Sequence, residues 1–301
     1  MKKSIAVIVL LALHLSLCAC GGDIEVPTRP AEAVTTPTRP ESAAAPEDPA
    51  TEATEEATES DEGKYPWEVE FREEDYVKFN FTAPNGDKIV TWREGSVMGM
   101  ERRNLYEWAD TGTICDNYYY PSGNLSHGYT WCLDGSYSES YHLDDGYYDQ
   151  QTGTTYNGTI VYQKNIYPDG TKSEQFFDES GNPARMITIS PDGIYDETEY
   201  YENGNIRKSI IDDPVKEEYQ VLESFENGNM KHLKFQTPEY TTEEKYDEEG
   251  YTTYFYTKRA DYEMECISDE TGKLAKVIEN GEEIEDAATF ARYAADYNFR
   301  Q

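Results

Sequence analysis

The sequence predicts an all-β protein, an antiparallel β-hairpin repeat array of meander or solenoid type that ends in a short C-terminal helix. Three observations predict this fold class. Glycines recur between residues 112 and 204 at intervals of 11 or 12 residues, which indicates an internal repeat. Polar and nonpolar residues alternate between these glycines, as in strands with one buried and one solvated face. Helical spacing of apolar residues is found only near the C-terminus.

Residues 1–19 are typical of a signal peptide. Two lysines precede an apolar run from Ile5 to Leu17, which is shorter than the ~20 residues that a spanning helix needs. Ala19, Cys20 and two glycines follow. This stretch resembles the lipobox of bacterial lipoproteins, in which the cysteine after a small residue is lipidated. The resemblance implies a mature protein that begins at Cys20 and is anchored by acyl chains to the extracytoplasmic face of the bacterial cell membrane. An ordinary secreted protein is the alternative.

Residues 20–64 are predicted to be the lipidated N-terminus and a disordered linker. Pro, Thr, Ala and Glu dominate here, and no aromatic residue is present. Such a segment cannot bury enough apolar surface to offset the entropy of ordering it. The composition changes at Tyr65, because all 26 tyrosines and all 4 tryptophans lie from there onward. We therefore assign residues 65–285 to the repeat domain.

The repeat units share one turn chemistry. Asp, Asn or Ser usually precedes the glycine, and these residues tolerate the positive φ that a tight hairpin turn requires. After Gly204 the glycine interval doubles, and "DDPVKEE" at the skipped position predicts a looser turn. Residues 286–301 place Phe290, Tyr293, Ala294 and Tyr297 at helical spacing. This segment is expected to be a helix that covers the last strands of the array; a helix that docks a partner is the other interpretation.

Two repeat families provide a resemblance. The stretches "YYENGNIRKS" and "SFENGNMKHLKF" resemble the bacterial MORN repeat, with its aromatic-x-x-Gly-x-aliphatic-basic core. The stretch "EEKYDEEGYTTYFY" is similar to the tyrosine-aspartate (YD/RHS-type) repeats of large bacterial surface and toxin shells. Both resemblances imply β-hairpin arrays. MORN-like arrays imply contact with a protein or a lipid and no catalysis, and neither family carries over a binding residue.

The charge of the chain limits its partners. Acidic residues number 60 against 26 basic ones, and the formal net charge is -34. Nucleic acid and anionic lipid headgroups would be repelled by such a chain. The acidic balance favours a cationic protein or peptide as partner, and general solubility is the alternative explanation.

No arrangement of residues predicts catalysis. A nucleophile elbow, a Walker loop and an H-E-x-x-H motif are all missing from the sequence. The three histidines after the signal peptide lack the spacing of a zinc site. We therefore expect no enzyme, no metal and no cofactor. Cys115 and Cys132 lie on either side of the turn at Gly123, nearly opposite each other. A cross-strand disulfide is one interpretation of this pair, and free thiols are the other.

Adjacent tyrosines are the candidate binding residues. Neighbours along a strand point to opposite faces, so one member of each pair packs and the other can face outward. Tyr119, Tyr148 and Tyr200 are the candidates for the outward row. Outward aromatics can hold a peptide or stack on sugars; packing of both faces is the alternative. The sequence thus predicts a membrane-anchored, non-catalytic binding protein with a protein or peptide partner. A cell-wall polysaccharide-binding module and a plain spacer are the alternatives.

Overall fold

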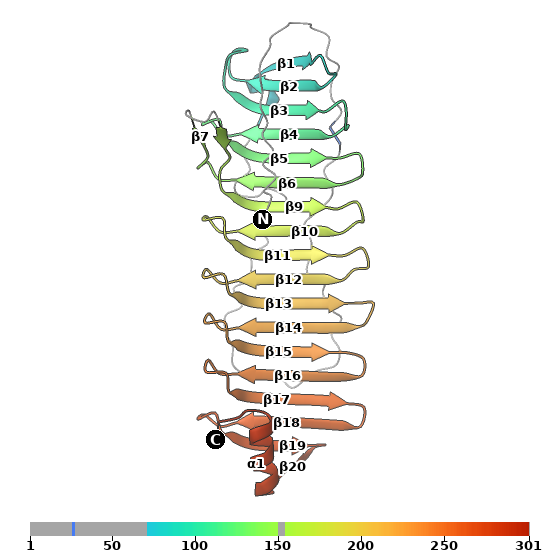
Figure 1. Cartoon of the computed structure of the whole chain (residues 1–301), viewed down its shortest axis with the longest axis vertical. Helices are drawn as coiled ribbons and strands as arrows, with labels where there is room; N and C mark the ends of the chain where they lie inside the picture. The colour runs from blue at the N-terminus through green and yellow to red at the C-terminus, as the bar shows by residue number, and fades with distance from the viewer. Residues whose placement is uncertain (1–25, 28–70, 150–153, 301) are drawn as a thin grey trace, which may run out of the picture.

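The computed structural model describes residues 26–27, 71–149 and 154–300. Its main feature is one 18-stranded antiparallel sheet in which the strands follow one another in chain order (Figure 1). This confirms the predicted all-β hairpin array, and the array is an open sheet. The strands are β1 (Val77–Thr82), β2 (Lys88–Arg93), β3 (Glu101–Glu107), β4 (Ile114–Tyr119), β5 (Leu125–Trp131), β6 (Tyr137–His142), β9 (Ile160–Ile166), β10 (Lys172–Phe177), β11 (Pro183–Ile189), β12 (Tyr195–Tyr200), β13 (Ile206–Asp213), β14 (Glu218–Ser224), β15 (Met230–Gln236), β16 (Tyr240–Tyr246), β17 (Thr252–Arg259), β18 (Tyr262–Ser268), β19 (Leu274–Glu279) and β20 (Glu282–Glu283).

One segment leaves the sheet between β6 and β9. It forms a separate hairpin of β7 (Tyr147–Asp149) and β8 (Thr154–Tyr156) at the edge of the array (Figure 1). The glycine spacing predicted ordinary hairpin turns at Gly146 and Gly158, and that prediction was wrong. Neither glycine takes a positive φ. They stand instead where the chain departs from the sheet and returns to it, because the residues between β6 and β9 are used by the side hairpin.

The tight turns hold the array together along its edges. Gly204 has φ 84°, and its turn is closed by hydrogen bonds between Tyr201 and the residues at 204 and 205. The Tyr201 hydroxyl donates to the carbonyl of Ser224 at 2.8 Å, one hairpin further along. The aromatic residue upstream of the glycine therefore links successive turns on the same edge. At the skipped position Glu217 replaces glycine with φ 55°, in line with the looser turn expected there.

The C-terminal helix α1 (Ala287–Asp296) packs on the last strands. Asp286 caps it by accepting a hydrogen bond from the Thr289 N–H at 2.8 Å. The predicted helical face lies against the sheet. The cluster beneath the helix contains Phe255, Met264, Cys266, Val277, Tyr293 and Phe299, with Phe290, Ala294 and Tyr297 packed around it. The last strands thus obtain the apolar cover that the helical spacing predicted.

The cysteine pair of β4 and β5 does not form a bridge. Across these strands Cys115 pairs with Thr130, and its Sγ lies 3.3 Å from the Thr130 hydroxyl. Cys132 lies just beyond β5. Both thiols are free, as is that of Cys266. Burial raises the pKa of the Cys115 thiol, and it raises the pKa of Cys266 to about 12.

Thiol labelling should follow these environments. The thiolate is the reactive form, so we expect Cys266 to resist iodoacetamide in the native protein and to react in urea. Peptide mass spectrometry without reductant should find Cys115, Cys132 and Cys266 all alkylated in urea. Protection of Cys115 and Cys132 together under those conditions would show a disulfide instead.

The cluster under α1 can be tested with two methionines. Met264 is 1 % exposed and Met230 is 36 % exposed. Met264→Ala should lower the free energy of unfolding by roughly 2–4 kcal/mol, because it leaves a cavity in this cluster. Met230→Ala should change it by about 0.5 kcal/mol or less. Urea denaturation of the two variants gives the comparison, and equal effects would contradict the packing described above.

Candidate interaction surface

The two faces of the sheet carry different chemistry. Side chains alternate along a strand, so residues paired across strands and residues two apart in one strand share a face. One row of paired residues forms what we call the ring ladder. It consists of Trp92, Arg103, Tyr118, His127, Tyr141, Tyr162 and Phe176, in strands β2 to β10.

Contacts between rings run from Tyr118 to Phe176 in the ring ladder, stacked at His127 and edge-on or tilted beyond Tyr141. The ring of His127 lies between those of Tyr118 and Tyr141, with centroids 4.4 and 5.3 Å away. Tyr162 continues the contact at 5.6 Å from Tyr141 and 5.1 Å from Phe176. These contacts between rings bury apolar surface along the row, within the layer of the sheet.

A buried ion pair fixes the start of the ring ladder. The Arg103 guanidinium lies 4.4 Å from the Trp92 ring centroid and 5.0 Å from that of Tyr118. It donates to both carboxylate oxygens of Asp116, at 2.7 and 2.8 Å. Burial alone would lower the pKa of Arg103, but the hydrogen bonds to Asp116 raise it. The cation therefore stays charged between two rings and aligns them.

The other face carries an uncharged strip in strands β3 to β11, which we call the polar face. It consists of two adjacent rows: Asn104, Asn117, Gly128, Ser140, Gln163, Gln175 and Met186 in one, and Tyr106, Cys115, Thr130, Ser138, Asn165, Ser173 and Thr188 in the other. None of these positions holds Asp, Glu, Lys or Arg, although 29% of the residues of the chain are charged. All but Gly128 and Ser173 are half-buried.

Hydrogen bonds order the first strands of the polar face. The Asn117 amide donates to Asn104 Oδ1 at 3.0 Å, and the Asn104 amide donates to the Tyr119 hydroxyl at 2.7 Å. Gly128 keeps this region shallow, because a Cβ at that position would lie 2.5 Å from Asn117 Oδ1. The result is a flat surface of amide, hydroxyl and small side chains.

The predicted tyrosines are distributed unevenly over the structure. Tyr119 is next to the polar face, half-buried, and burial raises its pKa. Tyr200 lies on the same face of β12, two residues after Thr198, which pairs with Met186. Tyr119 and Tyr200 therefore lie on the same side of the sheet, one near each end of the polar face. The side chain of Tyr148, in β7, and all of Cys20 lie outside the described residues.

Sequence reasoning missed the polar face itself. The signal that could have found it was the pairing register, because the uncharged residues are scattered in sequence and adjoin only when the strands are aligned. The tyrosines stood out by their number, whereas the Asn, Gln, Ser and Thr residues beside them did not.

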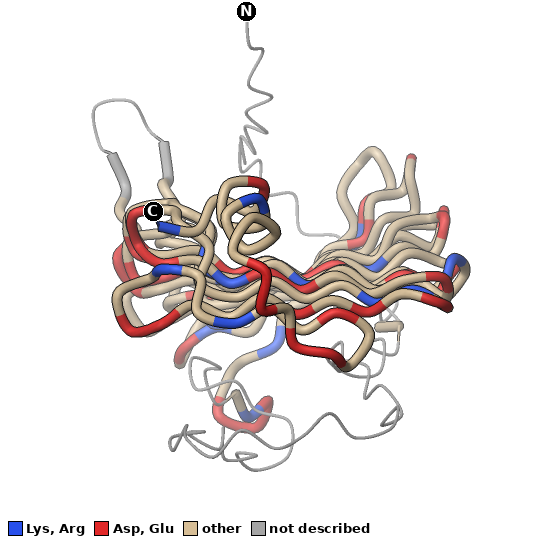
Figure 2. The backbone as a smooth tube through the Cα atoms, turned by 90° about the horizontal axis from the view of Figure 1, so that it is seen from below, with Lys and Arg blue, Asp and Glu red and all other residues tan. Residues whose placement is uncertain are grey.

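Acidic residues gather at the turns along both edges of the sheet, as Figure 2 shows from the end of the array. Many of these carboxylates have a structural role. Asp169 and Asp178 accept hydrogen bonds from the backbone N–H groups of Thr171 and Asn182, which lower the pKa of both carboxyls. The edges therefore remain anionic, and the uncharged strip lies between two negatively charged borders.

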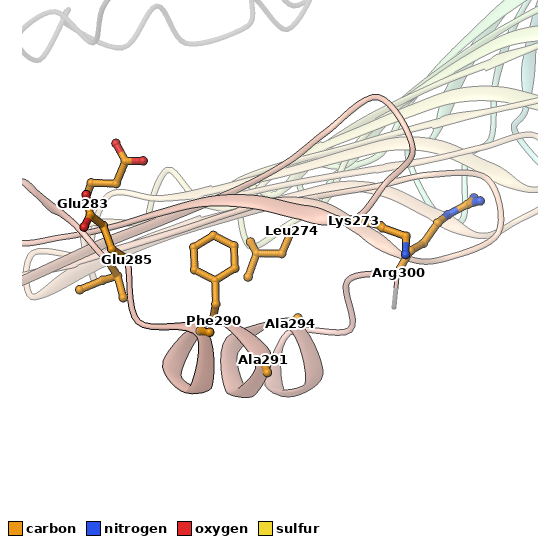
Figure 3. A pocket seen from close by; sticks show the side chains of 10 residues that line it. Lys273, Leu274, Glu283, Glu285, Phe290, Ala291, Ala294 and Arg300 are labelled. Atoms are coloured by element: carbon orange, nitrogen blue, oxygen red, sulfur yellow. The ribbon is translucent and has the colours of Figure 1, made fainter.

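A shallow pocket of about 550 Å³ lies between α1 and β19 (Figure 3). Leu274 and Phe290 form its apolar floor, and Glu283 and Lys273 lie on its rim. The Arg300 guanidinium at one end is paired with Asp247 at 2.7 Å. The lining of this pocket combines apolar side chains with charged ones.

Two further site types are not found in the described ranges. No group of three His, Cys, Asp or Glu side chains there could hold a metal ion. None of the helices described is long and apolar enough to cross a membrane.

Comparisons with known proteins give structural similarity only. No protein family matches the chain, and no curated protein is significantly similar to it in sequence. Among solved structures it is similar to the TCP10 domain of Danio rerio CPAP as an E1021V mutant, with 17% identity, 69% of this chain and 98% of that chain covered, and a TM-score of 0.29. The wild-type domain in complex with a peptide of Danio rerio STIL is 15% identical, with 67% of this chain and 98% of that chain covered and a TM-score of 0.27. A crystal structure of TcdB2-TccC3-Cdc42 is 10% identical, with 68% of this chain and 16% of that chain covered and a TM-score of 0.16.

Proposed function

We propose that this chain is a non-catalytic interaction protein whose polar face binds a protein partner. One observation carries the proposal: fourteen adjoining positions of a strongly charged chain hold no charged residue. The cores of protein interfaces are depleted of charge in the same way. The combination of Tyr, Ser, Gly and Asn in this strip is also the composition that antibodies use to contact proteins.

The shape of the polar face limits what can bind there. It crosses seven strands, a length of about 29 Å at ~4.8 Å per step between neighbouring strands. Tyr106 and Tyr119 supply aromatic contact area at one end, close to the amides of Asn104 and Asn117. A partner would lie flat or extended along the strip and hydrogen-bond to its amides and hydroxyls. The acidic edges would favour a partner with positive charge around the contact.

The proposed location follows from the N-terminal residues. Cys20 and its lipobox-like context support a lipid anchor on the extracytoplasmic face of the bacterial cell membrane. The residues between Cys20 and Phe71 would connect this anchor to the sheet. The polar face would then be presented to proteins at the cell surface.

Metabolic labelling tests the anchor. Radiolabelled palmitate should enter the wild-type protein and should be absent from the Cys20→Ala variant, because the acyl chains need the thiol of that cysteine. The Cys115→Ala variant is the matched control and should be labelled like the wild type. Label that persists in Cys20→Ala would contradict the proposed anchor.

A single charge placed in the polar face tests the binding proposal. In Gln163→Glu a carboxylate enters the middle of the strip, and an unpaired charge in an interface should weaken binding at least ~10-fold. Gln236→Glu makes the same chemical change on the opposite face, in β15, and should bind normally. In-cell cross-linking and capture, followed by titration with the identified partner, gives the affinities. Equal affinity of both variants would contradict the proposal.

A cell-wall polysaccharide is the second candidate ligand. The amide and hydroxyl groups of the polar face, with Tyr119 beside them, also suit sugar recognition. Co-sedimentation of the purified protein with isolated sacculi separates the two candidates. Saturable binding that Gln163→Glu abolishes would support the polysaccharide, and its absence would leave the protein partner.

A further inference from the structure

The face that carries the ring ladder is more deeply buried than the sheet alone explains. In β6 the side chains of Tyr137, Glu139 and Tyr141 are buried, whereas Ser138 and Ser140 on the polar face are only half-buried. Tyr141 and Tyr162 are both 0% exposed. Neighbouring strands can surround a ring on its sides, but full burial also needs a cover above the sheet.

None of the described elements supplies this cover. The η1 turn (Glu73–Asp75) contacts β1, and α1 contacts β19. The β7–β8 hairpin stands at the edge of the sheet (Figure 1). The described helices and strands therefore leave this face open between β5 and β12.

The same face provides its own control further along the array. Tyr254 and Tyr256 of β17 lie in the rows that contain the ring ladder and Glu139, by continuous pairing through β10 to β16. Both are half-buried. Tyrosines in equivalent rows are thus half-buried in one part of the sheet and fully buried in another.

We propose that residues 28–70 of this chain lie across the ring ladder in an extended form, from β4 toward β12. The place where the chain enters the sheet supports this occupant. The ring of Phe71 is 6.1 Å from that of Trp92 and 5.5 Å from that of Tyr118. Phe71, the residue at which the described chain resumes, therefore lies on this face, at the first strands of the ring ladder.

The length of the segment is sufficient. Six steps between neighbouring strands separate β4 from β12, about 29 Å at ~4.8 Å per step. A polyproline II chain advances ~3.1 Å per residue, so about 10 residues cover that distance. Residues 28–70 exceed this several-fold.

The composition of the segment suits a row of rings. Tyr65, Trp67 and Val69 are its apolar residues nearest to Phe71. Prolines recur through the rest, at Pro30, Pro37, Pro40, Pro46, Pro49 and Pro66. Proline-rich chains dock on aromatic surfaces because their conformation is preformed and little entropy is lost. A segment that is disordered alone can order on such a surface.

Site-specific photo-crosslinking in the full-length protein tests this proposal. A p-benzoylphenylalanine in place of Tyr162 should cross-link within the same chain to peptides from residues 28–70. The same group in place of Gln163, the next residue on the opposite face, should not. Cross-links from position 162 to a second copy, to another protein or only to neighbouring strands would overturn the proposal. This result does not depend on whether the polar face binds a partner.

Proteolysis of unlabelled protein gives an independent readout. Trypsin should cut slowly after Lys64, the basic residue of this segment that is not followed by proline, if the segment is docked. Tyr162→Ser should speed this cut at least ~10-fold, since cleavage follows the population of the undocked form. Gln163→Ser is the matched control and should leave the rates unchanged, and circular dichroism should show both variants folded. Equal cleavage rates in a folded Tyr162→Ser would also overturn the proposal.

Discussion

The constant register of the sheet is the constraint on which the other features depend. Each tight turn contains a residue with positive φ, and these turns fix the register between successive strands. Side chains at paired positions therefore form rows that run across the sheet. One shift by a single residue would turn the following strands over and exchange the two faces. The ring ladder, the Arg103–Asp116 pair and the uncharged strip lie where the pairing is regular, because the register shifts in β4 and β6 come only after Tyr118 and Tyr141.

A sheet of one layer must obtain its stability along these rows. Most globular domains bury one face of a sheet against a second layer. Here rings stack on rings in one half of the array, and opposite charges alternate in the other, as between Arg185 and Glu197 at 2.6 Å. The carboxylates at the turns accept hydrogen bonds from backbone N–H groups. The acidity of the sequence is therefore partly a structural property.

The parts of the fold that depend on local signals could be predicted from the sequence. The spacing of the glycines predicted the strands and most of the turns, and the helical spacing of Phe290 and Tyr293 predicted α1. The side hairpin was missed because Gly146 and Gly158 keep the spacing of the series while lying outside the sheet. The polar face and the hydroxyl partner of Tyr119 depend on which strands are paired, which single residues do not show. Burial of Tyr162 depends on contacts far from it in sequence.

The linear pairing of the strands has a consequence for the size of the molecule. Each strand of the sheet contacts mainly the strands before and after it. The last strands also contact the helix α1. Gaining or losing one hairpin pair would change the length of the sheet by roughly 10 Å and preserve the rows on either side. The length of the sheet is therefore set by the number of hairpins in the sequence.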